Sequence, residues 1–189
     1  MVPGDLPQVV AMFERLQQAN AGSFPRTRLV EEIFGPGRQG LEAWLQRGSD
    51  DQHLLLVDDL TPEVIGHLAI QELSLDMSPG EGSYWEPAFT RQPLFAQQQY
   101  RGRQLELTDL AVIKRFGIDP SHQGAGAGRF LLSEALRAIS QDLDKVPALV
   151  ILSDLVAAQK LYLTTGALCL GHVTEQNGAE ITSYLFPQD

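Results

Sequence analysis

The sequence contains a single cysteine, Cys169, among its 189 residues. One cysteine cannot form an internal disulfide or a multi-cysteine metal site, so the cytoplasm is the default compartment. No hydrophobic run approaches the ~18 residues that a membrane-spanning helix needs. The start of the chain, Met1–Asp5, has neither the basic residues nor the apolar core of a secretory signal. These absences predict a cytoplasmic protein without a membrane partner.

Basic residues are also scarce, since 14 Lys and Arg stand against 24 Asp and Glu, for a net charge of −10. A protein that binds nucleic acid needs a basic stripe to neutralise phosphates, and Lys114-Arg115 is too short to be one. His67, His122 and His172 are isolated, and with a single cysteine they form no recognisable metal-ligand spacing. We therefore expect no nucleic-acid partner and no metal site.

The residues that are present indicate an ordinary globular chain, 43% hydrophobic and 20% charged. At roughly 100–200 residues per domain, the length predicts one domain over residues 1–189. Hydrophobic residues at helical spacing and short hydrophobic runs bounded by turns give the order of elements. The predicted helices are 9–16, 29–34, 41–45, 131–139 and 155–163, and the predicted strands are 53–57, 64–71, one ending near 118, 149–152, 167–173 and 180–186. This order predicts an α/β or α+β fold with a mixed sheet.

The stretch 75–104 interrupts this order with three prolines and five aromatic residues. It is far longer than the ~12–15 residues of an ordinary connection. A loop that keeps its aromatic residues is either an ordered excursion on the surface, which could also form an oligomer contact as in a homodimer, or a lid over a substrate pocket. Both interpretations stay open.

The segment most informative about chemistry is a glycine-rich loop at residues 123–128, between a strand that ends near Ile118 and a helix. Glycines at 124, 126 and 128 let the backbone approach a ligand without interference from Cβ atoms. The first turn of the following helix presents N–H groups that have no acceptor within the helix. Such a loop favours binding of a phosphate or pyrophosphate.

Two familiar nucleotide sites fit this loop poorly. A dinucleotide fold requires Gly-x-Gly-x-x-Gly in a strand–helix unit near the start of a parallel sheet, whereas the spacing here is Gly-x-Gly-x-Gly. A nucleotide P-loop requires Gly-Lys-Ser/Thr, which the sequence lacks. A third interpretation fits both the spacing and the context.

The loop Gln123-Gly-Ala-Gly126-Ala-Gly128 resembles the Gln/Arg-x-x-Gly-x-Gly/Ala signature of the GNAT superfamily of N-acetyltransferases. A second element of that family follows in the right order, because the segment from Ala158 to Ala167, with Leu161-Tyr162 and Gly166, is similar to its Ala-x-x-Leu-Tyr-x-x-x-Gly-Phe helix end. The resemblance covers nearly the whole chain except 75–104.

The resemblance implies a mixed, mostly antiparallel central sheet flanked by helices, with splayed fourth and fifth strands. It also implies acetyl-CoA as cosubstrate, with its pantetheine pairing along the fourth strand and its pyrophosphate on the glycine loop. The implied binding residues are Phe116, Gly117 and Ile118 on the strand, and Gln123, Gly124, Ala125, Gly126, Ala127, Gly128 and Arg129 in the loop.

The catalytic residues implied by the resemblance are an acid and a base. Tyr162 occupies the family's tyrosine position and is expected to return a proton to the departing thiolate. Many relatives carry a glutamate shortly before the position of Phe116, where this chain has Lys114 and Arg115. We therefore assign the base to Asp109, with Glu106 or a water molecule as alternatives.

The sequence thus predicts an acetyl-CoA-dependent N-acetyltransferase acting on a primary amine of a small molecule or peptide. A non-catalytic acyl-CoA-binding module and a nucleotide-binding regulator are the alternatives. Acidic and aromatic residues in 75–104 favour a cationic acceptor, whereas the arginines of the same stretch could hold a carboxylate. These are Glu81, Tyr84, Trp85 and Glu86 on one side, and Arg91, Arg101 and Arg103 on the other.

Overall fold

The structure, a computed structural model, describes residues 5–19, 37–46, 51–74, 88–152, 155–174 and 180–187. The chain divides into two compact units. Unit 1 comprises Met1–Ala69 and Arg115–Leu132, and unit 2 comprises Ile70–Lys114 and Ser133–Asp189. The predicted helix at 29–34 and the first part of the excursion, 75–87, lie outside the described residues. The assignment of one domain to residues 1–189 stays a prediction.

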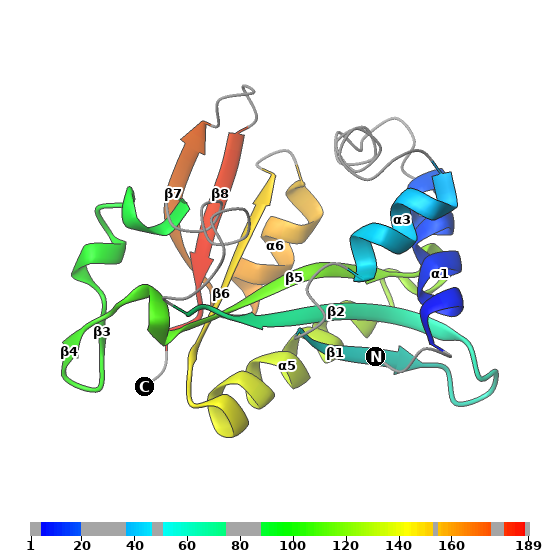
Figure 1. Cartoon of the computed structure of the whole chain (residues 1–189), viewed down its shortest axis with the longest axis horizontal. Helices are drawn as coiled ribbons and strands as arrows, with labels where there is room; N and C mark the ends of the chain where they lie inside the picture. The colour runs from blue at the N-terminus through cyan, green and yellow to red at the C-terminus, as the bar shows by residue number, and fades with distance from the viewer. Residues whose placement is uncertain are drawn as a thin grey trace. The chain divides into compact units, whose positions relative to one another are not determined.

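Unit 1 begins with two helices that pack against each other, α1 (Leu6–Ala19) and α3 (Gly37–Gln46) (Figure 1). It continues with β1 (Gln52–Val57) and most of β2 (Val64–Glu72). The last part of β5 (Leu110–Ile118) and the start of α5 (Ala127–Ala138) complete it.

The core of unit 1 forms on the hydrophobic face of α1. The buried side chains recur three and four residues apart, as the 3.6-residue helical period requires. They cluster with one residue of α3 and one of β2; the members are Val9, Val10, Met12, Phe13, Leu16, Leu45 and Val64. The sequence predicted this helix and its buried face.

Unit 2 contains β6 (Val146–Leu152), α6 (Val156–Thr164), β7 (Leu168–Thr174) and β8 (Glu180–Leu185). β8 pairs antiparallel with β6 on one side and with β7 on the other, and Figure 1 shows β7 and β8 running side by side. A π-helical turn at Ile139–Leu143 extends α5 before β6 begins.

The main sheet has six strands in the order β1-β2-β5-β6-β8-β7. β5 and β6 are parallel neighbours joined through α5, whereas the other pairings described for β6, β7 and β8 are antiparallel. The predicted fold class, a mixed and mostly antiparallel sheet with flanking helices, is confirmed.

The predicted fourth and fifth strands correspond to β5 and β6. Their parallel ladder pairs Leu110–Ile113 with Val146–Leu149. β5 continues beyond this ladder to Ile118, and β6 continues beyond it in its antiparallel pairing with β8. The ladder therefore covers only the first four residues of each strand. The splay of the two strands stays a prediction.

The described part of the excursion, 88–104, is ordered and belongs to the core of unit 2. It contains a 3-10 turn at Phe95–Gln97 and a small hairpin of β3 (Gln99–Tyr100) and β4 (Arg103–Gln104). Phe89 and Phe95 are buried in the cluster that also holds residues of β5, β6 and β8. The Ser183 hydroxyl donates a hydrogen bond of 2.5 Å to the Ala88 carbonyl. This half of the excursion is therefore packed by its own aromatic side chains.

Among the helices of the described residues, none is both long and apolar enough to cross a lipid bilayer.

Candidate active site

The glycine loop begins with a turn that a buried carboxylate organises. Asp119 is 3% exposed, and its Oδ1 accepts hydrogen bonds from the Ser121 amide (3.0 Å) and the Ser121 hydroxyl (2.5 Å). Its backbone amide donates to the Ile65 carbonyl of β2 at 2.8 Å. Asp119 thereby caps the 3-10 turn at Pro120–His122 and sets the direction in which the loop leaves β5.

Helix α1 supports the same turn from the side. The Arg15 Nε donates to Asp119 Oδ2 at 2.6 Å. Burial by itself raises the pKa of Asp119, but the hydrogen bonds from Ser121 and Arg15 outweigh burial and leave this pKa below its usual value. Asp119 is therefore ionised at neutral pH and serves the loop as a fixed acceptor.

The loop itself takes a conformation that favours glycine. Gly124 and Gly126 have φ angles of +82° and +90°, and a Cβ at either position would meet no atom within 4 Å. The Gln123 side chain turns back and donates from Nε2 to the Ile118 carbonyl at 3.0 Å. The first bond of α5 runs from the Phe130 amide to the Gly126 carbonyl, so the amides before Phe130 precede the helical hydrogen-bond ladder.

These features match the requirements of a phosphate group. The loop exposes backbone at two glycines and leads into the positive end of a helix dipole. Every loop residue predicted for the pyrophosphate, Gln123 to Arg129, lies in this one segment of unit 1, and the segment follows directly on Phe116–Ile118. The structure thus brings the predicted cofactor residues together, while their binding role stays a prediction.

Gly117 has a packing role that the sequence did not reveal. A Cβ on Gly117 would lie 2.9 Å from Phe13 and 3.1 Å from Leu16, two buried side chains of α1. The absence of a side chain lets α1 approach β5 closely at this point. The strand predicted to pair with pantetheine is therefore held against a helix.

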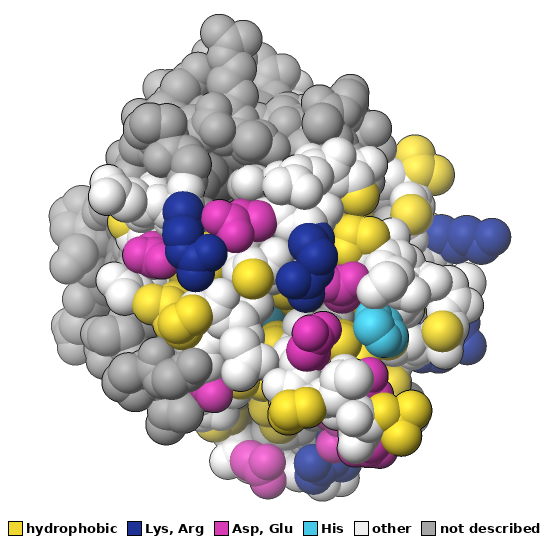
Figure 2. Space-filling view, turned by 90° about the vertical axis from the view of Figure 1, so that its right-hand side faces the viewer, with side chains coloured by type: hydrophobic (Ala, Val, Ile, Leu, Met, Phe, Trp, Pro, Cys, Tyr) yellow, Lys and Arg dark blue, Asp and Glu magenta, His cyan; other side chains and the backbone are white. Residues whose placement is uncertain are grey.

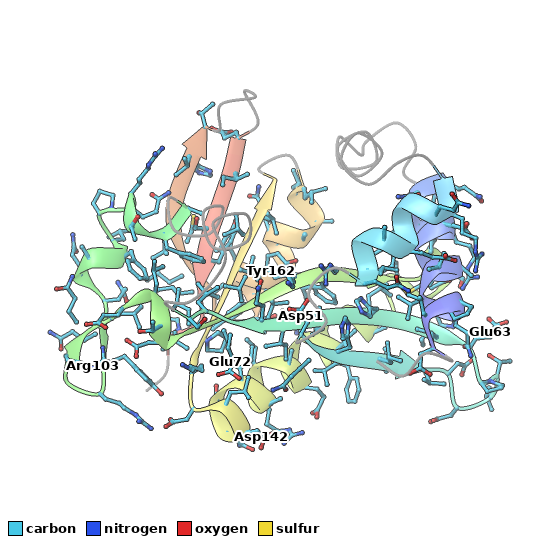
Figure 3. The ribbon with its side chains drawn as sticks, in the orientation of Figure 1. Asp51, Glu63, Glu72, Arg103, Asp142 and Tyr162 are labelled. Atoms are coloured by element: carbon cyan, nitrogen blue, oxygen red, sulfur yellow. The ribbon has the colours of Figure 1, made fainter. Side chains whose placement is uncertain are left out.

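Just before Gly117, the strand changes conformation at Arg115, which has a φ of +53°. The Arg115 side chain forms an ion pair with Asp51, labelled in Figure 3, at 2.7 Å between Nη1 and Oδ2. The Arg115 carbonyl lies 3.0 Å from His67 Nδ1, and His67 Nε2 lies 3.0 Å from His53 Nδ1. His67 therefore has two polar partners, His53 and the Arg115 carbonyl.

Within the described ranges, no three His, Cys, Asp or Glu side chains come together to hold a metal ion. The pKa of His67 is lowered from 6.5 to about 3, chiefly by burial and also by the nearby charges of His53 and Arg115, which together outweigh the hydrogen bond to the Arg115 carbonyl. His67 is therefore neutral at physiological pH.

Asp109, the predicted base, lies in unit 2 and has partners for both carboxylate oxygens. Arg103 donates from Nη2 to Oδ1 at 2.5 Å and from Nη1 to Oδ2 at 2.8 Å, and the Glu106 amide donates to Oδ2 at 2.9 Å. Burial alone raises the pKa of Asp109, but these hydrogen bonds outweigh it and lower this pKa. Asp109 and Glu106 form a reciprocal capping box on the 3-10 turn Leu107–Asp109.

Tyr162, the predicted acid, lies in the helix α6 of unit 2 and is labelled in Figure 3. It is 5% exposed, and its ring centroid lies 5.8 Å from that of Tyr184 on β8. The aromatic contact fixes the ring, so a phenol hydroxyl is held by packing rather than by a flexible chain. Tyr162 and Asp109 share unit 2, and the cofactor residues share unit 1.

A shallow hollow on unit 1 lies beside the loop. It is lined by Arg15, Gln18, Glu63, Asp119 and His122, and Glu63 is labelled in Figure 3. Figure 2 shows the face that carries α1, on which acidic and basic side chains are interspersed rather than gathered by sign.

Comparison with known proteins identifies a matching family. The profile of the Acetyltransferase (GNAT) family matches residues 13–167 of the chain. A protein-sequence relative, the harmonin-binding protein USHBP1 of Mus musculus, is 32% identical over 85 residues, which is 42% of this chain. The chain spans only 12% of the length of that relative.

Solved structures share the fold. A chimera of the spermidine N-acetyltransferase SpeG from Vibrio cholerae with hSSAT matches at a TM-score of 0.59 and 16% identity, over 98% of this chain and 93% of the other. The ribosomal-protein-S18-alanine N-acetyltransferase from Escherichia coli matches at a TM-score of 0.59 and 14% identity, over 100% of this chain and 92% of the other. A candidate streptothricin acetyltransferase from Bacillus anthracis, in complex with acetyl coenzyme A, matches at a TM-score of 0.51 and 12% identity, over 74% of this chain and 63% of the other. At these identities the likeness is one of fold.

Proposed function

Because this chain belongs to the acetyltransferase (GNAT) family, we propose that it is an N-acetyltransferase that uses acetyl-CoA to acetylate a primary amine of a small molecule or peptide. The observation that carries this proposal is the conformation of the glycine loop. Gly124 and Gly126 both adopt positive φ angles with open space beside them, directly before a twelve-residue helix. This is a backbone cradle for a pyrophosphate.

The residues present fit the cosubstrate. In the proposed complex, residues 123–129 hold the pyrophosphate through backbone N–H groups, and Phe116–Ile118 pair with the pantetheine as an added strand would. Acetyl-CoA, when bound, supplies the acetyl group as an activated thioester. What remains for the protein is to present a neutral amine, polarise the carbonyl oxygen and protonate the departing sulfur.

We assign the last of these tasks to Tyr162. A phenol is protonated at neutral pH and can donate its proton to a thiolate. Packing against Tyr184 supports this role, because a fixed ring delivers its hydroxyl to one place. The carbonyl oxygen of the thioester requires a backbone N–H donor. We assign this donor to the part of β5 that continues past its ladder with β6.

The group that removes a proton from the amine has two candidates. The notable alternative to the predicted base Asp109 is a water molecule, because Arg103 and the Glu106 amide already occupy both oxygens of this carboxylate. A carboxylate with a lowered pKa is also a weaker base. Because the carboxylate of Asp109 is already occupied, the second candidate function is a non-catalytic acyl-CoA-binding module of the same fold.

Two measurements on the full chain test the proposal. We expect acetyl-CoA and CoA to raise the melting temperature, since a ligand that binds only the native state adds about 2.7 kcal/mol at a hundredfold excess over Kd. NAD and ATP, the controls for a nucleotide-binding regulator, are expected to give no comparable shift.

The second measurement is release of free CoA in the presence of polyamines, alkylamines, amino acids and peptides with free amino groups. Amine-dependent release supports the transferase. Binding of acetyl-CoA without release with any amine class would favour the acyl-CoA-binding module instead. Absence of both binding and release would contradict the family-based function altogether.

A further inference from the structure

Arg115 is the one residue of β5 that departs from strand conformation, since its φ of +53° lies in the left-handed region. An arginine in this region costs of order 1–3 kcal/mol, because its Cβ crowds its own backbone. Such a conformation persists only where the surroundings over-determine it. The contacts of the Arg115 side chain and carbonyl must therefore hold this conformation.

The side chain of Arg115 is fixed by Asp51, the residue that precedes β1 (Figure 3). Both side chains are almost fully buried, at 6% and 3% exposure, and Nη1 lies 2.7 Å from Oδ2. A buried ion pair contributes little net stability, because desolvation of the two charges offsets their attraction. Its clearer effect is geometric, as the guanidinium can lie in only one place.

The carbonyl of Arg115 is fixed by His67 of β2. A carbonyl oxygen only accepts hydrogen bonds, so the His67 Nδ1 at 3.0 Å must carry the proton. In a neutral ring the Nε2 is then an acceptor, and the His53 Nδ1 at 3.0 Å must donate to it. Phe13 of α1 meets the same ring edge-on at 5.7 Å. The histidine is thus locked in one tautomer and one orientation.

We propose that Asp51 and His67 are positioning residues for acetyl transfer, which together hold Arg115 in its left-handed conformation and so set the direction of the backbone of Phe116–Ile118. The inference rests on the proposed function, in which that backbone receives the cosubstrate. Asp51 acts on the side chain of Arg115 and His67 on its carbonyl. Neither residue touches the reacting atoms.

Glycine provides the first test, because it adopts positive φ without steric cost. Asp51→Ala should lower kcat/KM by about tenfold to a hundredfold, the cost of a small misplacement near the reacting groups. Asp51→Ala/Arg115→Gly should recover most of that loss. Asp51→Ala/Arg115→Ala, the matched control, removes almost the same atoms but keeps a Cβ that opposes the left-handed conformation, and should not recover.

Folding is monitored beside activity by circular dichroism and melting temperature. Glycine is less strained than alanine at positive φ, so the glycine double variant is expected to be the more stable of the two. Turnover is therefore compared per folded protein, at a temperature well below both melting transitions, where a purely structural role predicts equal activity for the two. Faster turnover by the glycine double variant supports the proposal. A glycine double variant no faster than the alanine one would overturn it.

Histidine provides a second test that avoids the buried charges. His67→Asn places an amide donor near the position of Nδ1, whereas His67→Gln places it near the position of Nε2. The proposal predicts that His67→Asn keeps a higher kcat than His67→Gln, with a smaller difference in KM. Equal kcat values, or the reverse order, would contradict the role of the contact with Arg115.

Glu134→Gln, which breaks the exposed ion pair with Arg137 on α5, serves as the unrelated control and should behave as wild type. Failure of the inference is distinguishable from failure of the proposed function. If the wild-type protein neither binds nor consumes acetyl-CoA, the proposed function is contradicted. If the wild type is active and the variants of Asp51 and His67 have the same kcat as wild type, only the positioning role is contradicted.

Discussion

Gly126 combines a φ of +90° with open space where a side chain would stand. We predict that Gly126→Val abolishes the melting-temperature shift caused by CoA, because the new side chain fills the backbone cradle and strains the loop. Gly102→Val is the matched control, since Gly102 has a φ of +75° and equally open surroundings in the β3–β4 hairpin. It should lose similar stability and keep the shift. A CoA shift that survives in Gly126→Val would contradict the assignment of the pyrophosphate to this loop.

Tyr162 offers a change that removes one oxygen and leaves the ring contact with Tyr184 in place. We predict that Tyr162→Phe lowers kcat by about 10²-fold or more with little change in KM for acetyl-CoA, as expected when a general acid is lost. Steady-state kinetics with saturating amine measures this. Wild-type kcat in the variant would reduce Tyr162 to a packing residue.

His67 gives a pH dependence with a defined sign. Its pKa falls from 6.5 when unfolded to about 3 when folded, so below pH 6.5 the unfolded chain binds a proton that the native state refuses. The native state therefore loses stability as the pH falls through this window, by about 2 kcal/mol near pH 5. Urea unfolding of wild type and His67→Asn at neutral pH and near pH 5 should show a smaller decrease for the variant. Parallel decreases would show that His67 titrates normally.

At the scale of elements, the Arg103–Asp109 ion pair joins the β3–β4 hairpin to the turn that precedes β5. Asp109→Asn and Arg103→Gln break the same contact from opposite sides. We predict that both variants lower the melting temperature and that their kcat values are similar, because the carboxylate serves the turn. General-base catalysis typically contributes about 10²–10⁴-fold. A loss of that size confined to Asp109→Asn would establish Asp109 as the base.

The elements themselves were largely predictable, because each of them carries a local signal. α1 shows its buried face in the helical spacing of its hydrophobic residues, whereas β2 and β8 are short runs rich in β-branched and hydrophobic residues, buried along nearly their whole length. The β3–β4 hairpin has two residues in each strand, too few for any period. Its position depends on tertiary contacts, as Tyr100 and Arg101 both bind Asp144, which lies more than forty residues further along the chain.

The candidate site was predictable from the sequence only where its residues are contiguous. The glycine loop is a contiguous signature whose conformation follows from its composition. The cluster around Arg115 is not contiguous, because Asp51 lies 64 positions away and His67 48. The presence of an arginine where relatives carry a glutamate was visible in the sequence, but its buried partner was not. Pairings of this kind arise only from the register of β1, β2 and β5.

At the scale of the whole molecule, net charge bears on the choice of acceptor. The chain carries a charge of −10, and two arginines that could clamp a carboxylate already bind acidic partners, Arg101 with Asp144 and Arg103 with Asp109. The acidic and aromatic residues of 81–86 lie outside the described residues. We predict that a cationic amine is preferred over its α-carboxylated analogue, because opposite charge steers the encounter.

The measurement is kcat/KM for such a matched pair at low and high salt. The preference for the uncarboxylated amine should weaken as salt screens the protein's field. A salt-sensitive preference for the carboxylated analogue would instead point to a free arginine, and Arg91 would be the first to change. A salt-independent difference would indicate shape rather than charge.

Two glycines of unit 1 are expected to tolerate no substitution, for two different physical reasons. A Cβ on Gly66 would lie 2.8 Å from Ile118 and 3.1 Å from Leu131, so any larger residue collides with the interior. Gly126 faces nothing within 4 Å and is restricted by its φ instead. A survey of tolerated substitutions would flag both positions alike. Under the proposed function the second marks a place where a ligand is recognised, whereas the first marks the spacing of a helix from a sheet.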